Sequence, residues 1–237
     1  MSLAVPLTQL TELEACESRL AHDLGSRDSE WALAPSALPG WTRAHVVAHL
    51  AGNAEALRNL VTWAASGVET PMYASQEVRA ADIERRSALP WSDLLRELER
   101  QSAALGEALR GLAEPVRERH VRQGSGAVVN VCDLAAIRIQ EVEIHRVDLA
   151  AEHQSQDWSP AFTTRTLDRL TPLFRSQRDV PVEVLRSLDT GTCWVVGDHG
   201  PDLVGSEAAL LAWLIGRPHE QISATDGTPP PQAPVWV

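Results

Sequence analysis

The sequence predicts a mainly α-helical protein, in which an N-terminal four-helix bundle precedes a small C-terminal α/β domain. Three observations support this prediction. Apolar residues recur at helical spacing in four long stretches before residue 150. Short β-rich runs separated by turn residues follow after residue 178. The chain has 237 residues and is 44% hydrophobic, which is enough for two unequal cores. We therefore expect the bundle over residues 1–155 and the α/β domain over residues 156–237.

The first two predicted helices lie near the N-terminus. Leucines recur at helical spacing over residues 7–24, and Gly25 is expected to end that helix. A longer helix is expected from Thr42, a residue type that caps helix N-termini, to near Gly67. The segment that follows, residues 69–86, is expected to be a connection with a short helix in it.

Two further helices complete the predicted bundle. Ser92 can cap the third helix, which carries a leucine stripe to about residue 112 and is expected to be ended by Pro115. Asn130 can cap the fourth helix, over residues 131–150. The connections between the four helices are long enough to allow a crossover, as in many bundles of this kind.

The predicted α/β domain begins with a helix. Ser159 and Pro160 open it, because proline is favoured in the first turn, and it extends to about residue 176. Two β-rich runs follow, VPVEVLRSL and TCWVVG, with a turn between them. Ser206 opens a last helix, which is expected to end at Gly216, and the proline-rich tail is expected to be extended.

The charge of the chain excludes two classes of partner. The formal net charge is −11, with 32 acidic and 21 basic residues. Such a surface repels phosphate backbones and anionic lipid, so we expect neither nucleic acid nor membrane partners. No stretch approaches the ~18 apolar residues that a membrane helix needs. An anionic substrate would require local positive charge from a metal ion or from arginines.

The cysteine content points to a reducing compartment. The chain has three cysteines, Cys16, Cys132 and Cys193, which are too few and too scattered for a disulfide framework. They form no Cys-x-x-Cys pair, so we do not expect a thiolate zinc site. The N-terminus lacks the basic region and apolar run of a signal peptide. We therefore expect a cytoplasmic protein.

Three side chains form a candidate metal site. Glu141 and His145 are four residues apart, so they lie on one face of the fourth helix. His49 lies among apolar residues of the second helix, so its imidazole is expected to point inward. Facing helices of a bundle can bring such groups together. Two imidazoles and one carboxylate suit zinc, and three protein ligands leave a fourth position open, as in catalytic sites.

Spacing alone leaves other interpretations open. Glu141 and His145 could be an exposed helix pair, and His49 could be a hydrogen-bonded core histidine. His45 and His49 are also four residues apart, so they compete as a half-site. The choice of metal ligands therefore depends on more than spacing.

Three stretches resemble a known family. They are GWTRAHVVAHLAGNAEALRNLVTWAASGVETPMY, IRIQEVEIHRVDL and IGRPHEQISATDGTPPPQAPVWV. The first two are similar to the helical region of mycothiol-dependent maleylpyruvate isomerases, and the third to their C-terminus. The resemblance implies a DinB-like four-helix bundle followed by a small α/β domain. It places the zinc ligands of the family on His49, Glu141 and His145, and it leaves His45 outside the ligand set.

The resemblance also implies a reaction. A zinc enzyme of this family would convert maleylpyruvate to fumarylpyruvate, a cis–trans isomerisation, with mycothiol as the low-molecular-weight thiol. The thiolate adds to the conjugated double bond, allows rotation and then leaves. The open zinc position would take the thiol sulfur. The expected cofactors are therefore Zn²⁺ and the thiol, and the expected substrate is a small unsaturated dicarboxylate.

Three arginines are candidates to bind the substrate, because a guanidinium pairs well with a carboxylate. Arg79 follows the first matching stretch, Arg138 lies three residues before Glu141, and Arg217 matches the Gly-Arg step of the family. A surface ion pair is the alternative for each. Asp148 and Asn53 each lie one turn beyond a proposed ligand, and either could orient an imidazole.

Rival functions share the same ligands. A related enzyme could transfer mycothiol, ergothioneine or bacillithiol to another electrophile. A zinc hydrolase would hold water at the open position. A metal-binding module without catalysis is the third rival, because a fold by itself does not determine a function.

Overall fold

The structure is a computed structural model that describes residues 7–177 and 179–234. Residues 1–6, in which the sequence predicts no signal peptide, lie outside the described residues. The chain divides into two compact units, Met1–Ala150 and Ala151–Val237, so the division falls a few residues before the predicted boundary. Among the described residues, no helix combines the length and apolar character that crossing a bilayer requires.

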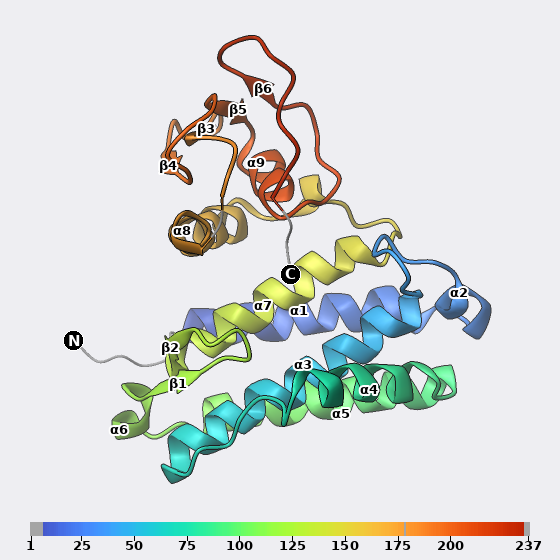
Figure 1. Cartoon of the computed structure of the whole chain (residues 1–237). Helices are drawn as coiled ribbons and strands as arrows, with labels where there is room; N and C mark the ends of the chain where they lie inside the picture. The colour runs from blue at the N-terminus through green and yellow to red at the C-terminus, as the bar shows by residue number, and fades with distance from the viewer. Residues whose placement is uncertain (1–6, 178, 235–237) are drawn as a thin grey trace. The chain divides into compact units, whose positions relative to one another are not determined.

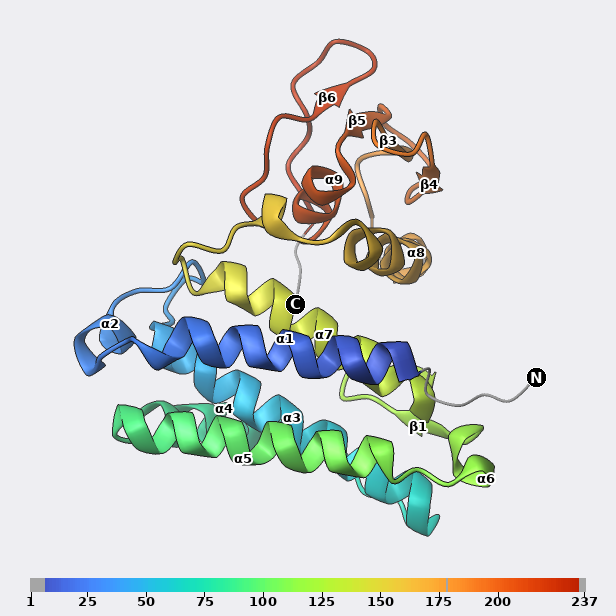
Figure 2. The same cartoon turned by 180° about the vertical axis from the view of Figure 1, so that it is seen from behind.

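Four long helices build the first unit (Figures 1 and 2). They are α1 (Leu7–Gly25), α3 (Arg43–Ser66), α5 (Trp91–Arg110) and α7 (Leu134–Asp148). Helix α3 packs most extensively against α5 and also contacts α7, while α1 packs against α7 and α5. The predicted mainly α-helical bundle with a small C-terminal sheet region is therefore confirmed.

Shorter elements connect the long helices of the first unit. They are α2 (Ser29–Leu33), α4 (Gln76–Ser87), α6 (Glu114–Arg117), the 3-10 turn η1 (Val131–Asp133), and the antiparallel strands β1 (His120–Arg122) and β2 (Val128–Asn130). Helix α4 packs against α3, so it covers one side of the central helix.

The sequence of α3 explains why it lies at the centre of the unit. Alanine, valine and leucine occupy most of its length, and most of them are buried. The small alanine side chains let the neighbouring helices pack closely against α3. Thr42 caps its start, as predicted, by accepting a hydrogen bond from the backbone N–H of His45. Gly67 ends it with φ 76°, a left-handed conformation that favours glycine.

Several predicted boundaries are wrong. Helix α5 begins at Trp91 after Pro90, so Ser92 lies inside the first turn and does not cap it. The helix ends at Arg110, and Pro115 lies in the first turn of α6, where proline is tolerated. Asn130 caps η1, which leads into α7. These errors arise because several residues near each helix end have side chains that could cap or end the helix.

The second unit combines two helices with a four-stranded sheet. Its elements are η2 (Ser155–Asp157), α8 (Pro160–Gln177), β3 (Val184–Ser187), β4 (Cys193–Val195), β5 (Leu203–Gly205), α9 (Glu207–Leu214) and β6 (Ser223–Ala224). The strand order is β4-β3-β5-β6, with β3 and β5 parallel and the other pairs antiparallel. The sequence predicted β3, β4 and α9 with its Ser206 cap, but not β5 or β6.

A buried carboxylate holds the second unit together. Glu207, at the start of α9, is 2% exposed. Hydroxyl groups from α8, from the last residue of β3 and from the β3–β4 turn donate hydrogen bonds to it; they belong to Thr163, Thr164, Ser187 and Thr190. The charge is therefore satisfied within the unit, which is the condition for burying a carboxylate without a large cost.

Candidate metal centre

The structure brings His49, Glu141 and His145 together, although His49 lies on a different helix. Nε2 of His49 is 3.1 Å from Oε2 of Glu141, and Nε2 of His145 is 3.8 Å from the same oxygen. The candidate ligand atoms of all three residues lie within 4.8 Å of one another. The two imidazole rings meet edge to face, with 4.6 Å between their centroids. Contact between α3 and α7 therefore creates the cluster.

The donor set fits a zinc ion. Bonds of about 2.0–2.2 Å in a tetrahedron place neighbouring ligand atoms about 3.3–3.5 Å apart. The distances of 3.1 and 3.8 Å from Glu141 bracket this range, so small side-chain adjustments would suffice. In the described part of the chain, no other group of three His, Cys, Asp or Glu side chains has this closeness. Two nitrogens and one carboxylate oxygen also leave room for a fourth ligand.

The protonation states of the cluster favour metal binding. Burial of His49 and the proximity of His145 lower the pKa of the His49 imidazole, which therefore stays neutral at neutral pH. Burial raises the pKa of Glu141, but the hydrogen bond from His49 and the positive charge around the carboxylate outweigh it. The net pKa of Glu141 lies well below its usual range. A neutral imidazole and an ionised carboxylate are the forms that bind metal ions.

Asp148 orients His145. Its Oδ2 lies 2.8 Å from Nδ1 of His145, and the carboxylate is buried. A carboxylate acceptor keeps the imidazole proton on Nδ1, so the Nε2 lone pair is left for a metal ion. The contact expected for Asp148 is thus present. Asn53 makes a different contact, since its Oδ1 accepts a hydrogen bond from Nη1 of Arg138.

His45 lies outside the cluster. Its Nδ1 is 2.7 Å from the Thr42 hydroxyl oxygen and 3.2 Å from the Thr42 backbone nitrogen, which completes a capping box at the start of α3. Its Nε2 is 3.4 Å from a carboxylate oxygen of Glu84. The competing pair of His45 and His49 is therefore separated by the structure.

Arg79 faces the cluster from α4. Its Nη2 lies 3.3 Å from Nδ1 of His49, and its guanidinium lies over the ring of Tyr73, 5.7 Å from the centroid. No carboxylate of the described residues forms an ion pair with Arg79, whose guanidinium is half-buried. A cation without a counter-charge beside a metal site is suited to bind an anion.

Arg138 has a different environment. It is fully buried, and Nε donates to Glu17 at 2.7 Å, while Nη1 donates to the carbonyl oxygen of Leu50 at 2.7 Å. Nη1 also donates to Asn53 at 2.9 Å and Nη2 to Ser102 at 3.2 Å. These bonds join α7 to α1, α3 and α5. The guanidinium is engaged by protein groups, which argues against contact with a substrate.

Arg217 belongs to the second unit. It follows α9, and its Nη1 donates to the carbonyl oxygen of Ile215 at 2.8 Å. Its part in the reaction stays a prediction.

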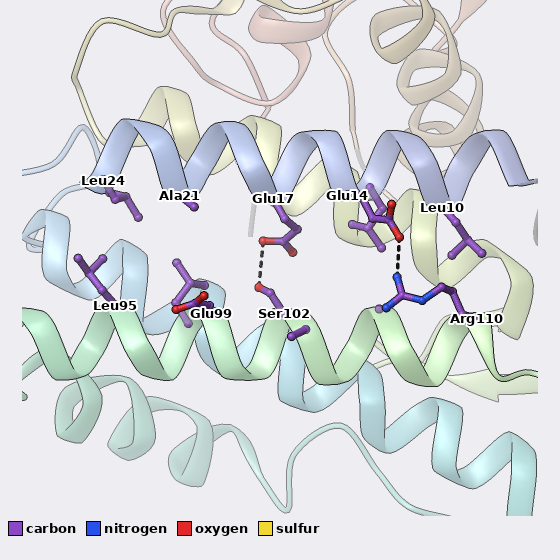
Figure 3. A pocket seen from close by; sticks show the side chains of 13 residues that line it. Leu10, Glu14, Glu17, Ala21, Leu24, Leu95, Glu99, Ser102 and Arg110 are labelled. Carbon is purple, nitrogen blue, oxygen red and sulfur yellow. Dashed lines mark hydrogen bonds and ion pairs between the residues drawn. The ribbon is translucent and has the colours of Figure 1, made fainter. Parts of the chain in front are cut away.

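A groove between α1 and α5 is separate from the metal cluster (Figure 3). It measures about 590 Å³ and is lined by leucines of both helices, and none of the three candidate ligands lines it. Glu17 accepts a hydrogen bond from Ser102 across the groove at 2.9 Å. Because Glu17 also binds Arg138, the groove floor is part of the buried network around that arginine.

Comparisons with known proteins agree with this geometry. A family model described as the mycothiol maleylpyruvate isomerase N-terminal domain matches residues 13–150. The crystal structure of the mycothiol-dependent maleylpyruvate isomerase is 31% identical, with 97% of this chain and 96% of that chain covered and a TM-score of 0.89. A histidine-to-alanine mutant of the mycothiol-dependent maleylpyruvate isomerase gives 30% identity with the same coverage and TM-score. Among curated proteins, none matches the chain.

Proposed function

The chain belongs to the mycothiol-dependent maleylpyruvate isomerase family, and from this premise we propose that it is a zinc- and thiol-dependent cis–trans isomerase. Its substrate is maleylpyruvate, its product is fumarylpyruvate, and mycothiol is its thiol. The observation that carries the proposal is the cluster of His49, Glu141 and His145 with Arg79 beside it. The cysteines Cys16, Cys132 and Cys193 are all free, which is consistent with a cytoplasmic enzyme.

The three clustered side chains would hold the metal. His49 and His145 offer imidazole nitrogens, Glu141 offers a carboxylate oxygen, and Asp148 keeps His145 in the required tautomer. A bound zinc ion would supply the Lewis acidity that keeps a coordinating thiol in its thiolate form at neutral pH. The Trp41 ring lies 5.9 Å from the His49 ring, so an aromatic side chain lies beside the cluster.

The proposed nucleophile is the added thiol, because no cysteine of the chain lies in the cluster. Cys16 is buried, and burial together with the neighbouring Glu143 raises the pKa of its thiol far above neutrality. The pKa of Cys132 is raised by burial and by Asp133, and its sulfur contacts the carbonyl oxygen of Arg117. None of the cysteines in the described residues is part of the cluster.

In the proposed reaction, the conjugated C=C double bond of the substrate must become a single bond transiently so that it can rotate. The thiolate forms a C–S bond to the alkene, and the π electrons move onto the conjugated carbonyl oxygen as an enolate. The remaining C–C single bond rotates, the electrons return, and the C–S bond breaks to release the same thiolate. Arg79 would bind a substrate carboxylate or stabilise the enolate, and Arg217 is a second candidate for that role.

The test is an assay of thiol and metal dependence. Metal-stripped and zinc-restored protein are each mixed with maleylpyruvate, either without thiol or with one thiol, namely mycothiol, ergothioneine or bacillithiol. Parallel reactions replace maleylpyruvate with another electrophile. We expect fumarylpyruvate only when zinc and mycothiol are both present. Turnover without thiol would support a hydrolase instead, and zinc-dependent turnover with another electrophile alone would support an S-transferase. No zinc binding at all would remove the enzymatic proposal.

A further inference from the structure

The two histidines of the cluster differ in the group that faces Nδ1. At His145, Nδ1 lies 2.8 Å from the carboxylate of Asp148, which is an acceptor. At His49, Nδ1 lies 3.3 Å from the guanidinium of Arg79, which is only a donor. The same ring atom thus has opposite hydrogen-bonding partners in the two residues.

This difference determines which nitrogen of each neutral ring carries the proton. The carboxylate keeps the proton of His145 on Nδ1 and leaves the Nε2 lone pair for a metal ion. The guanidinium makes Nδ1 of His49 the acceptor, so the proton lies on Nε2, 3.1 Å from the Glu141 oxygen that accepts it. His145 is therefore prepared for a metal ion at Nε2, whereas His49 is held in the opposite tautomer.

Coordination through Nε2 of His49 requires the proton to move to Nδ1. Nδ1–H would then face the N–H groups of Arg79, and two donors cannot hydrogen-bond each other. The positive charge of the guanidinium also repels a divalent cation. Both effects weaken metal binding while Arg79 stays against His49.

Arg79 can be drawn away from His49 more easily than the buried arginines can leave their places. Among the described residues, its side chain contacts His49 and Tyr73 and forms no ion pair. Arg86, by contrast, is 4% exposed and forms ion pairs with Glu55, Asp82 and Glu97. A ligand carboxylate would give Arg79 the counter-charge that the described residues do not supply.

We propose that Arg79 couples the metal centre to carboxylate binding: it opposes the metal ion at His49 until an anion holds its guanidinium. This inference rests on the proposed metal centre. By reciprocity, a bound carboxylate tightens metal binding, and a bound metal ion tightens carboxylate binding by the same factor. This coupling would favour the state in which the metal ion and the anionic substrate are both bound.

The test measures Zn²⁺ affinity by competition with a chelating dye, with and without maleate as a small cis-unsaturated dicarboxylate. We expect Arg79→Ala to bind Zn²⁺ about tenfold more tightly than the wild type without maleate. Maleate should tighten Zn²⁺ binding by a similar factor in the wild type and leave Arg79→Ala unchanged. Arg85→Ala removes an exposed arginine of the same helix and should behave as the wild type.

A second measurement separates the tautomer from simple charge repulsion. Nitrogen-15 NMR of the metal-free wild type should show the His49 proton on Nε2, and Arg79→Ala should shift it towards Nδ1. Equal Zn²⁺ affinity of the wild type and Arg79→Ala, or an equal effect of maleate on both, would overturn the coupling. Failure of the metal centre itself gives a different result, because His145→Ala would then bind Zn²⁺ as well as the wild type does.

Discussion

Two polar regions that share helix α7 differ in how completely their charges are paired. Around Arg138, each described donor group meets an acceptor on α1, α3 or α5, and the guanidinium is fully buried. Around Glu141, two imidazoles and one carboxylate converge, and Arg79 adds a cation that has no carboxylate partner within residues 7–177 and 179–234. In the first region the donors of the arginine are paired within the protein, whereas the second region has groups that can still bind a metal ion and an anion. This difference favours Arg79 over Arg138 as the arginine that would bind an anion in the proposed site.

The largest effect is expected from removal of a metal ligand. His49→Ala should weaken Zn²⁺ binding by roughly a thousandfold or more, which exceeds the effect of losing a supporting partner. Isomerase activity should fall with it. Elemental analysis and dye competition provide the measurement.

The matched control for this variant is His45→Ala. His45 belongs to the cap of α3, so its loss should cost about 1 kcal/mol of stability and leave zinc content unchanged. Equal zinc content in His49→Ala and the wild type would contradict the assignment of the centre.

The second prediction concerns the paired region. Arg138→Met should lower the free energy of unfolding by about 3–5 kcal/mol, because it leaves the Glu17 carboxylate without its buried counter-charge. Urea denaturation measures the loss. The double variant Arg138→Met with Glu17→Leu should recover part of it, since an apolar pair removes the uncompensated charge. If the single variant keeps full stability but loses substrate affinity, Arg138 contacts the substrate after all.

The third prediction tests the partner of His145. Asp148→Asn should weaken Zn²⁺ binding by about 10–100-fold. The asparagine amide carries no charge and can donate as well as accept, so it no longer holds the His145 proton on Nδ1. Asn53→Ala is the comparison, since Asn53 binds Arg138 and neither histidine. It should affect stability more than Zn²⁺ affinity. An unchanged affinity in Asp148→Asn would argue against the orienting role of the carboxylate.

The smallest expected effect is a pH dependence of the metal-free protein. Because the pKa of His49 is lowered on folding, the unfolded chain binds more protons below the ordinary histidine value of about 6.5. Stability contributed by neutral His49 is therefore present at pH 7 and is lost progressively as the pH falls from about 6.5 towards about 4. Thermal unfolding midpoints should drop over this interval, and less so in His49→Gln. A flat profile in the wild type would show that His49 is not held neutral by burial.

Local sequence signals predicted much of the first unit but not its exact ends. The capping of α3 by Thr42 and its end at Gly67 depend on neighbouring residues, and both were correct. The start of α5 was not, because Pro90 ends the preceding connection where Ser92 offered a better side-chain cap. The strands β5 and β6 escaped prediction because they are only a few residues long. Their pairing partners are distant in the sequence.

The candidate site shows the same division. The spacing of Glu141 and His145 predicted that they share a helix face, and the family resemblance selected His49 over His45. Nothing in the periodicity distinguished Arg79 from Arg138, since both are arginines near the predicted ligands.

The sequence by itself therefore determined the long helices to within a few residues, their apolar faces and the chemical types of the candidate ligands, because these properties depend on residues within a few turns. Only the tertiary structure decided that His49 meets Glu141, and that Arg138 is enclosed while Arg79 is open. Those outcomes depend on which helix packs against which. The partner of a buried charge can lie more than 100 residues away in the chain, as Glu17 does from Arg138 with a separation of 121, which is beyond the reach of any local pattern.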